Sequence, residues 1–314
     1  MPAPRASWPV LALTLLLPAC ADTETDTSAI PADTGAAAVA EAAPTSIADI
    51  GLQTPESVLY DERADLYLIS NINGEPVGRD DNGFISRVRP SGEVEQLKWI
   101  DGASESVTLN APKGMALRGD TLFVADIDSV RAFHRTSGAP LGARGVSGVS
   151  SFLNDLAVGP DGTLYVTDTG MDAAFSPTGT DAVHRFTESG SEPIATAPQV
   201  TSPNGILVTE GGLIVVGFGG NAVQRFPLNG AGGGPEQVAQ LPAGQLDGVV
   251  RTSDGSLLVS SWEAQAIFRI APDGQVSAVV ENVEAPADIG YDSRRHRVLI
   301  PLFSGNRIEI RDVH

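Results

Sequence analysis

The chain has 314 residues, of which 42% are hydrophobic, 19% are charged and 5% are aromatic, and it contains 34 glycines and 22 prolines. This composition excludes a disordered polymer and a bundle of membrane helices, and the short runs of Val, Leu, Ile and Ala favour many small strands. The formal charge of -19 repels phosphate backbones and anionic headgroups, so we expect neither nucleic-acid binding nor direct electrostatic binding to a membrane.

An apolar run near the start of the chain covers residues 8–17 and follows Arg5. This arrangement predicts a secretory signal peptide over residues 1–19. The run is too short to span a bilayer, which takes about 20 apolar residues. We therefore expect the chain to be exported.

The end of this predicted signal carries Leu17, Ala19 and Cys20, and Cys20 is the only cysteine of the chain. The three positions resemble the bacterial lipobox, in which the cysteine is lipidated and becomes the new N-terminus. Because Ala21 does not match the inner-membrane retention signal of enteric bacteria, we expect a lipid anchor at Cys20 in the outer membrane, facing the periplasm. An ordinary secretory signal with a chance cysteine is the alternative.

Residues 20–45 are rich in Ala, Asp, Thr, Glu and Pro and contain few large apolar side chains. Such a segment buries too little surface to offset the entropy lost on ordering, so we predict a disordered acidic tether. The chain would then contact the membrane through its lipid anchor alone.

Residues 46–314 repeat one template: a polar residue, an apolar strand, an Asp-Gly type of turn, a second apolar strand and later a strand that contains an arginine. The third copy, for example, runs from Asn154 through the turn at residues 159–162 to a strand at residues 183–186. The opening positions, spaced 40–57 residues apart, are Glu56, Lys113, Asn154, Asn204, Asp247 and Ala287.

Repeats of this length with about four short strands are typical of β-propeller blades, so we predict an all-β, six-bladed β-propeller over residues 46–314. The last copy, residues 286–311, supplies only three strands, whereas a strand-like segment at residues 47–52 precedes the first copy. The N-terminal strand is therefore predicted to close the sixth blade as its outer strand, which removes an open seam.

In a propeller the first strand of each blade is innermost, so the opening positions would meet around one axis. Taken singly, each is readily explained as turn chemistry. Together, Glu56, Asn154, Asn204 and Asp247 bring two carboxylates and two amide oxygens into one channel, where unpaired carboxylates repel each other. A divalent cation relieves that repulsion, and all-oxygen ligation favours Ca²⁺ over zinc.

These residues resemble the regucalcin/gluconolactonase superfamily of six-bladed propellers, which is also the senescence marker protein and LRE-like group. The resemblance covers about residues 47–314 and is carried by Glu56, Asn154-Asp155, Pro203-Asn204-Gly205 and Asp247-Gly248. It implies Ca²⁺ or another divalent ion held by Glu56, Asn154, Asn204 and Asp247. It also implies a metal-dependent hydrolase that cleaves a lactone or an ester as its small-molecule substrate.

The same resemblance implies catalytic roles for two carboxylates. Asp247 corresponds to the family's base beside the metal. Asp155 would orient Asn154 or assist proton transfer.

The sequence departs from the family pattern at two places. Glu56 is followed by Ser57-Val58, where family members usually have Gly-Pro, and Lys113 puts a cation at the opening position of the second blade. Lys113 would either bind an anionic substrate or a developing oxyanion, as a catalytic residue, or pair with Glu56 or Asp247 in place of the metal.

Residues that end the second strand of each repeat are candidates for a substrate-binding wall. They are Asn71, Asp126, Asp168, Phe218, Trp262 and Phe303. Asp126 and Asp168 are equally well explained as caps of their strands. Two long loops, residues 71–83 and 169–181, follow second strands and are interpreted as lids over the site or as surface decoration.

The main competing hypothesis is a non-catalytic periplasmic propeller that binds a ligand or a protein at the channel mouth. A scaffold of that kind would tolerate loss of the oxygen ring, and an enzyme would not. A carbon-carbon or carbon-nitrogen lyase on the same fold would need a differently placed acid or base, and the sequence offers no such constellation. The sequence leaves the substrate and the oligomeric state open.

Overall fold

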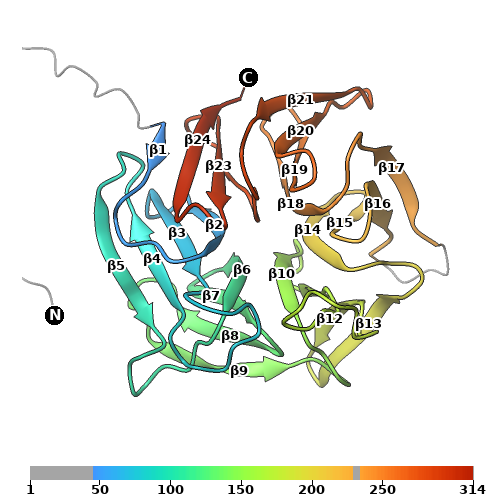
Figure 1. Cartoon of the computed structure of the whole chain (residues 1–314). Helices are drawn as coiled ribbons and strands as arrows, with labels where there is room; N and C mark the ends of the chain where they lie inside the picture. The colour runs from blue at the N-terminus through green and yellow to red at the C-terminus, as the bar shows by residue number, and fades with distance from the viewer. Residues whose placement is uncertain (1–44, 229–233, 314) are drawn as a thin grey trace, which may run out of the picture. The chain divides into compact units, whose positions relative to one another are not determined.

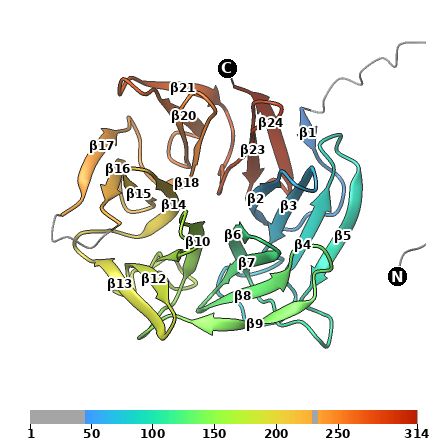
Figure 2. The same ribbon diagram turned by 180° about the vertical axis from the view of Figure 1, so that it is seen from behind.

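Residues 45–228 and 234–313 are described by the structure, a computed structural model, and they form six four-stranded antiparallel sheets arranged as blades in a ring (Figures 1 and 2). The prediction of an all-β, six-bladed β-propeller is confirmed. The described residues include no helix long and apolar enough to cross a membrane. The predicted signal peptide over residues 1–19, the lipidation site Cys20 and the tether as far as residue 44 lie outside the described residues and stay predictions.

The first three blades each take four strands in chain order. Blade 1 consists of β2 (Pro55–Asp61), β3 (Leu66–Asn71), β4 (Phe84–Val88) and β5 (Val94–Asp101). Blade 2 consists of β6 (Pro112–Arg118), β7 (Thr121–Asp126), β8 (Ser129–His134) and β9 (Pro140–Gly145). Blade 3 consists of β10 (Leu153–Val158), β11 (Leu164–Asp168), β12 (Ala182–Thr187) and β13 (Gly190–Thr196).

The remaining blades follow the same order, except that the last one takes its outer strand from the start of the chain. Blade 4 consists of β14 (Pro203–Thr209), β15 (Gly212–Gly217), β16 (Ala222–Phe226) and β17 (Glu236–Gln240). Blade 5 consists of β18 (Leu246–Arg251), β19 (Leu257–Ser261), β20 (Ala266–Ile270) and β21 (Val276–Glu281). Blade 6 consists of β22 (Gly290–Asp292), β23 (Arg297–Leu302), β24 (Arg307–Asp312) and β1 (Ser46–Ile47).

Burial falls from the axis of the ring to its rim. Every residue of β11 is buried, whereas every residue of β9, the outermost strand of blade 2, is exposed. Apolar side chains of the inner strands pack between neighbouring blades; one such cluster joins blades 6 and 1 through Val58, Ile69 and Leu299. The cores therefore lie between the blades, and each blade depends on its neighbours to bury its faces.

The first strand closes the ring, as predicted. β1 pairs antiparallel with β24, which places Ile47 opposite Ile308. The Ile310 N–H also donates to the Thr45 carbonyl at 2.9 Å. The paired segment is shorter than predicted, because β1 ends at Ile47, and Leu52 packs in the same core cluster from outside any strand.

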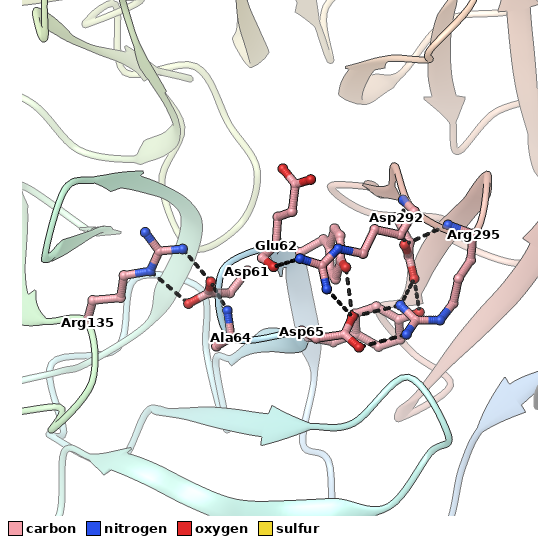
Figure 3. A network of polar contacts seen from close by, with 10 residues as sticks. Asp61, Glu62, Ala64, Asp65, Arg135, Asp292 and Arg295 are labelled. Atoms are coloured by element: carbon pink, nitrogen blue, oxygen red, sulfur yellow. Dashed lines mark hydrogen bonds and ion pairs between the residues drawn. The ribbon is translucent and has the colours of Figure 1, made fainter. Parts of the chain in front are cut away.

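Ion pairs reinforce the junctions of blade 1 with blades 6 and 2 (Figure 3). Arg295 of blade 6 donates to both carboxylate oxygens of Asp65 at 2.8 and 2.7 Å, and to Asp292 at 3.0 Å. Arg135 of blade 2 donates through Nε to Asp61 at 2.9 Å, and its Nη2 contacts the other oxygen of the same carboxylate. Guanidinium groups that contact a carboxylate at two points form the stronger kind of ion pair. Blade 1 is thus held by both of its neighbours.

Ile47→Ala is expected to destabilise the propeller, because the side chain is 2% exposed and packs in the cluster between blades 6 and 1. Removing a buried aliphatic side chain of this size lowers the free energy of unfolding by about 2–4 kcal/mol. The midpoint of urea unfolding measures the effect, with Val149→Ala, at a position 81% exposed, as the control. An Ile47→Ala midpoint equal to that of the wild type would contradict closure of the ring by β1.

Candidate metal centre at the propeller axis

Inner strands begin with a β-bulge at the axis. In blade 1, Pro55 pairs with Asn71 and Val58 pairs with Ile69, so two residues of β2 lie opposite one residue of β3. The same shift in register occurs at the start of β6, β10, β14 and β18. Such bulges re-aim side chains. The first residues of these bulges are Glu56, Lys113, Asn154, Asn204 and Asp247.

Buried hydroxyl groups on the second strands of blades 3 and 5 hold the bulges of these blades and also bind the next blade. In blade 3, Thr167 Oγ1 accepts the N–H of Asp155 at 2.9 Å and donates to the Asn204 carbonyl of blade 4 at 2.6 Å. In blade 5, Ser260 Oγ accepts the N–H of Gly248 at 2.8 Å and donates to the Ala287 carbonyl, which leads into blade 6, at 2.9 Å. Each hydroxyl therefore ties one blade's bulge to the start of the next inner strand.

Neighbouring inner strands approach so closely that the second bulge position of three blades, occupied by Gly114, Gly205 and Gly248, has no room for a side chain. A Cβ atom at Gly205 would lie 2.3 Å from the Asp247 carbonyl oxygen, and one at Gly248 would lie 2.4 Å from the Ile289 nitrogen. Because these contacts are with backbone, they cannot be relieved by moving a side chain. The positions around the axis are fixed by the backbone itself.

All five first residues of the bulges line one cavity of about 30 Å³ at the axis. Lys113 is fully buried, and the predicted metal ligands Glu56, Asn154, Asn204 and Asp247 are 3–4% exposed. The sixth opening position, Ala287, is buried and is not among the lining residues. The structure thus brings together the ring that the repeats predicted, with no contribution from Ala287.

Each of the four predicted ligands has one side-chain oxygen without a hydrogen-bond partner among the described residues. Glu56 Oε2, Asn154 Oδ1, Asn204 Oδ1 and Asp247 Oδ1 are buried and accept no hydrogen bond from the described residues. Each unpaired buried polar atom costs about 1–3 kcal/mol. Four such oxygens on one cavity call for a partner that they can share, and a cation is that kind of partner.

A hard divalent cation fits this set of donors. No group of three or more His, Cys, Asp or Glu side chains is arranged for a metal within residues 45–228 and 234–313, so the two amide oxygens are needed to complete the set. Ca²⁺ accepts carboxylate and amide oxygens and takes water at its remaining positions, whereas zinc prefers nitrogen and sulfur. The donors therefore suit Ca²⁺ or another oxygen-seeking ion.

Two further carboxylates lie at second bulge positions beside the ring. They belong to Asp155 of blade 3 and to Asp288 at the corresponding place in blade 6, where Asp288 Oδ2 accepts a hydrogen bond from Ser57 Oγ at 2.5 Å. Burial, followed by the charge of the neighbouring carboxylates, raises the pKa of Glu56, Asp155 and Asp247 well above the usual range. Burial also raises the pKa of Asp288 to about 7. Ionising these buried carboxyl groups together is unfavourable without a positive charge nearby, which is a second reason to expect a cation.

The repeat pattern alone does not single out Asp288, because the opening position of the sixth repeat is Ala287. The signal was present, since Asp288 follows Ala287 as Asp155 follows Asn154. Its charge raises the pKa of both Asp155 and Asp247, so it belongs to the electrostatics of the site.

The amide of Asn154 is oriented by Thr169 and not by Asp155, which corrects one of the two roles predicted for Asp155. Asn154 Nδ2 donates to Thr169 Oγ1 at 3.0 Å, and this hydroxyl donates to a backbone carbonyl of blade 4 at 2.8 Å. The two oxygens of Asp155 accept backbone N–H groups, from Leu156 at 2.6 Å and from Ile206 at 2.8 Å. Thr169 thus leaves Asn154 Oδ1 directed at the cavity.

Lys113 makes no ion pair with the ring carboxylates within the described part of the chain. Its Nζ donates to the carbonyls of Pro76 at 2.8 Å and Ala111 at 3.0 Å, and it lies 4.5 Å from the centre of the Phe152 ring. Burial lowers the pKa of Lys113 to about 8, against the opposing effect of Glu56. In the structure the ammonium binds backbone carbonyls and not the four oxygens, and through Pro76 it fastens the loop at residues 71–83 over the cavity.

Three residues predicted to form the pocket wall do not line the cavity. Asn71, Asp126 and Asp168 are fully buried and bind the backbone that leads into the inner strands. Asn71 Oδ1 accepts the N–H of Gln53 at 3.0 Å, and Asp168 Oδ1 accepts the N–H of Phe152 at 3.0 Å. Asp126 accepts backbone N–H groups in the same way. These contacts correct the prediction, since they are those of strand-end caps.

The other three predicted wall residues, Phe218, Trp262 and Phe303, do line the cavity. Both long loops also contribute to it: Pro76 comes from residues 71–83, and Phe175 comes from residues 169–181. The loops therefore lie at the mouth of the site.

Comparison with known proteins finds one matching family and several solved structures with a similar fold. The SMP-30/Gluconolactonase/LRE-like region family matches residues 54–289. A gluconolactonase from Xanthomonas campestris is 19% identical, with a TM-score of 0.62, over 83% of this chain and 87% of that one. A streptogramin B lyase is 14% identical, with a TM-score of 0.59, over 84% of this chain and 94% of that one.

A catalytically inactive His-to-Ala variant of virginiamycin B lyase from Staphylococcus aureus is 15% identical, with a TM-score of 0.54, over 83% of this chain and 95% of that one. At these identities the solved structures establish the shared fold alone. None of the curated proteins compared with the chain matches it.

Asp288→Asn is expected to reduce the dependence of stability on pH in a chelating buffer. Folding raises the pKa of Asp288 from an ordinary 3.8 to about 7. Between these two pH values the folded state keeps a proton that the unfolded state has lost. Stability therefore falls as the pH rises through the window. The amide removes this contribution, about 2–4 kcal/mol at pH 8, and thermal unfolding at about pH 4.5 and pH 8 measures it.

Asp273→Asn, in an exposed turn, is the matched control and should keep the pH dependence of the wild type. If Asp288→Asn keeps it as well, the buried carboxylate cluster described above is wrong.

Proposed function

Because the chain belongs to the SMP-30/gluconolactonase/LRE-like family, we propose that it is a metal-dependent hydrolase that opens a lactone or cleaves an ester at the propeller axis. The observation that carries the proposal is the set of four buried, unpaired oxygens around one cavity. The gluconolactonase among the similar structures supports this class of reaction.

Glu56, Asn154, Asn204 and Asp247 would hold the ion, which we propose to be Ca²⁺ or another hard divalent cation. When bound, such an ion polarises the substrate carbonyl and stabilises the negative charge that grows on its oxygen. The protein keeps the four oxygens in place beforehand, since the bulges fix their backbone and Thr169 fixes the Asn154 amide. Preorganised donors of this kind need little rearrangement during the reaction.

Asp247 is the proposed general base. Its Oδ1 has no partner among the described residues, and its pKa is raised by burial and by the charge of Asp288. With Oδ1 on the ion, the second carboxylate oxygen would accept the proton. It would take a proton from the attacking water and return it to the leaving oxygen as the C–O bond breaks.

Asp155 and Lys113 receive supporting roles in this proposal. Asp155 links blades 3 and 4 through the Ile206 N–H and adds negative charge behind the ring. Burial lowers the pKa of the Lys113 ammonium to about 8. Two of its three N–H groups bind carbonyls, which leaves one for an oxygen that gains charge in the reaction.

The lyase reaction of two structural neighbours is not proposed. One of those lyases is catalytically inactive when a histidine is replaced by alanine. No histidine is among the described residues that line this cavity. A ligand-binding propeller without catalysis remains the alternative, and the experiment below separates it from the hydrolase.

Asp247→Asn is expected to lower kcat/KM for lactone or ester hydrolysis by about 10²–10⁴-fold, because an amide cannot accept the proton. The assay follows acid release from small lactones and phenyl esters by the purified protein. Wild-type activity should disappear in a chelating buffer and return when Ca²⁺ or another divalent ion is added.

Asp273→Asn serves as the control, since it makes the same chemical change in an exposed turn, and it should keep full activity. Undiminished hydrolysis by wild type in chelator would rule out metal dependence. A protein that hydrolyses none of these compounds, yet still binds ligands after the ring is mutated, is the binding propeller.

A further inference from the structure

The cavity at the axis has a polar floor and an apolar wall. Its charged lining residues, Glu56, Lys113 and Asp247, all belong to inner strands. Its aromatic lining residues come from outside the ring positions and are Phe152, Phe175, Phe218, Trp262 and Phe303. Aromatic side chains thus adjoin the charged ring, as where Phe152 lies 4.5 Å from Lys113 Nζ.

The aromatic side chains support one another. The rings of Phe218 and Trp262 pack edge to face with centroids 5.4 Å apart, and those of Trp262 and Phe303 are 5.2 Å apart. The three side chains are nevertheless partly exposed. Mutually packed rings that keep an exposed surface at a cavity mouth are typical of a site that an apolar ligand covers.

Phe175 faces this surface from the loop at residues 169–181. Its ring is 6.3 Å from that of Phe152, and the side chain is 45% exposed. The loop has hydrogen bonds of its own, from Phe175 N–H to Asp172 at 3.0 Å and from Thr178 N–H to Gly170 at 2.7 Å. The loop is thus a formed turn that presents an aromatic ring at the mouth.

The wall offers little to a substrate hydroxyl group. Apart from the ring residues, the described lining has two polar side-chain groups with N–H or O–H, Thr169 Oγ1 and Trp262 Nε1. Thr169 Oγ1 already accepts one hydrogen bond and donates another. Trp262 Nε1 is buried, has no regular hydrogen bond among the described residues, and is near enough to the Asp247 carboxylate to lower its pKa. The whole wall therefore offers a substrate hydroxyl group at most this one N–H donor, which also lies beside Asp247.

These contacts discriminate between classes of lactone. A sugar lactone carries several hydroxyl groups that lose water on entry, and each one left unpaired weakens binding by about tenfold or more. An alkyl or aryl substituent gains from burial, and a methylene group in an apolar pocket is worth about tenfold or more in kcat/KM. The wall therefore selects for apolar substituents.

We infer that the substrate is a lactone or ester with an alkyl or aryl substituent, and not a polyhydroxylated sugar lactone. The inference rests on the proposed hydrolase function, in which water adds to the carbonyl carbon and the C–O bond breaks to give an acid and a hydroxyl group. The carbonyl would reach into the axial cavity of about 30 Å³, and the substituent would lie outside it, on the exposed faces of Phe218, Trp262 and Phe303.

Three six-membered lactones test the inference: unsubstituted δ-valerolactone, pentyl-substituted δ-decalactone and glucono-δ-lactone. With Ca²⁺ present, kcat/KM for δ-decalactone should exceed that for δ-valerolactone by about tenfold or more, and glucono-δ-lactone should be the poorest substrate. Trp262→Ala should lower the value for δ-decalactone by about tenfold or more while changing that for δ-valerolactone by less than about threefold. Leu141→Ala, at a position 57% exposed on β9, is the control and should change neither.

A binding measurement separates failure of this inference from failure of the hydrolase proposal. The probe is the lactam of the same ring with a pentyl chain, which resists hydrolysis, and the readout is the fluorescence of Trp262. Binding should change the fluorescence of the wild type, and the change should be absent in Trp262→Phe.

Each outcome has one meaning. Faster hydrolysis of glucono-δ-lactone than of δ-decalactone overturns the inference and leaves the hydrolase standing. Binding of the lactam without hydrolysis of any lactone supports the apolar wall and removes the hydrolase. Neither hydrolysis nor binding overturns both.

Discussion

The β-bulge at the start of the inner strands is the constraint on which the whole site depends. Around the ring, an inner strand places two residues opposite one residue of its neighbour, and the first of the two lines the axial cavity. Hydroxyl groups such as that of Thr167 hold the bulges from behind, and glycines such as Gly248 allow neighbouring strands to touch. Because these contacts involve backbone atoms, they fix the positions whatever side chain is present. Glu, Lys, Asn and Asp can therefore share one geometry.

The same arrangement gathers unfavourable electrostatics at the axis. A chain with a net charge of -19 buries the carboxyl groups of Glu56, Asp155, Asp247 and Asp288 close together, and burial raises the pKa of all four. Apolar cores between the blades and the ion pairs around blade 1 stabilise the fold that holds them. Lys113, the one cation among the described lining residues, binds carbonyls instead. A divalent ion would offset the charge and satisfy the unpaired oxygens at once.

Repetition made much of the fold predictable from the sequence. A recurring unit and a last copy one strand short predicted six blades and a closing N-terminal strand, because these arguments need no knowledge of side-chain direction. The ring was predictable for the same reason, since equivalent positions in equivalent strands meet at the axis. The repeat pattern does not predict the direction in which a side chain points. Asn71, Asp126 and Asp168 end their strands as expected, yet bind the approaching backbone. Asp288 lies one position beyond the aligned register, and Thr169 acts through a contact that appears only in three dimensions.

The position of a bound ion tests the central claim most directly. Crystals of the protein grown with Ca²⁺, measured at a wavelength where calcium scatters anomalously, would locate it. The account predicts one peak on the axis, about 2.3–2.6 Å from an oxygen of each of Glu56, Asn154, Asn204 and Asp247. An axial cavity that holds water alone at saturating Ca²⁺, or a Lys113 ammonium bound to the four oxygens in place of the ion, would contradict it.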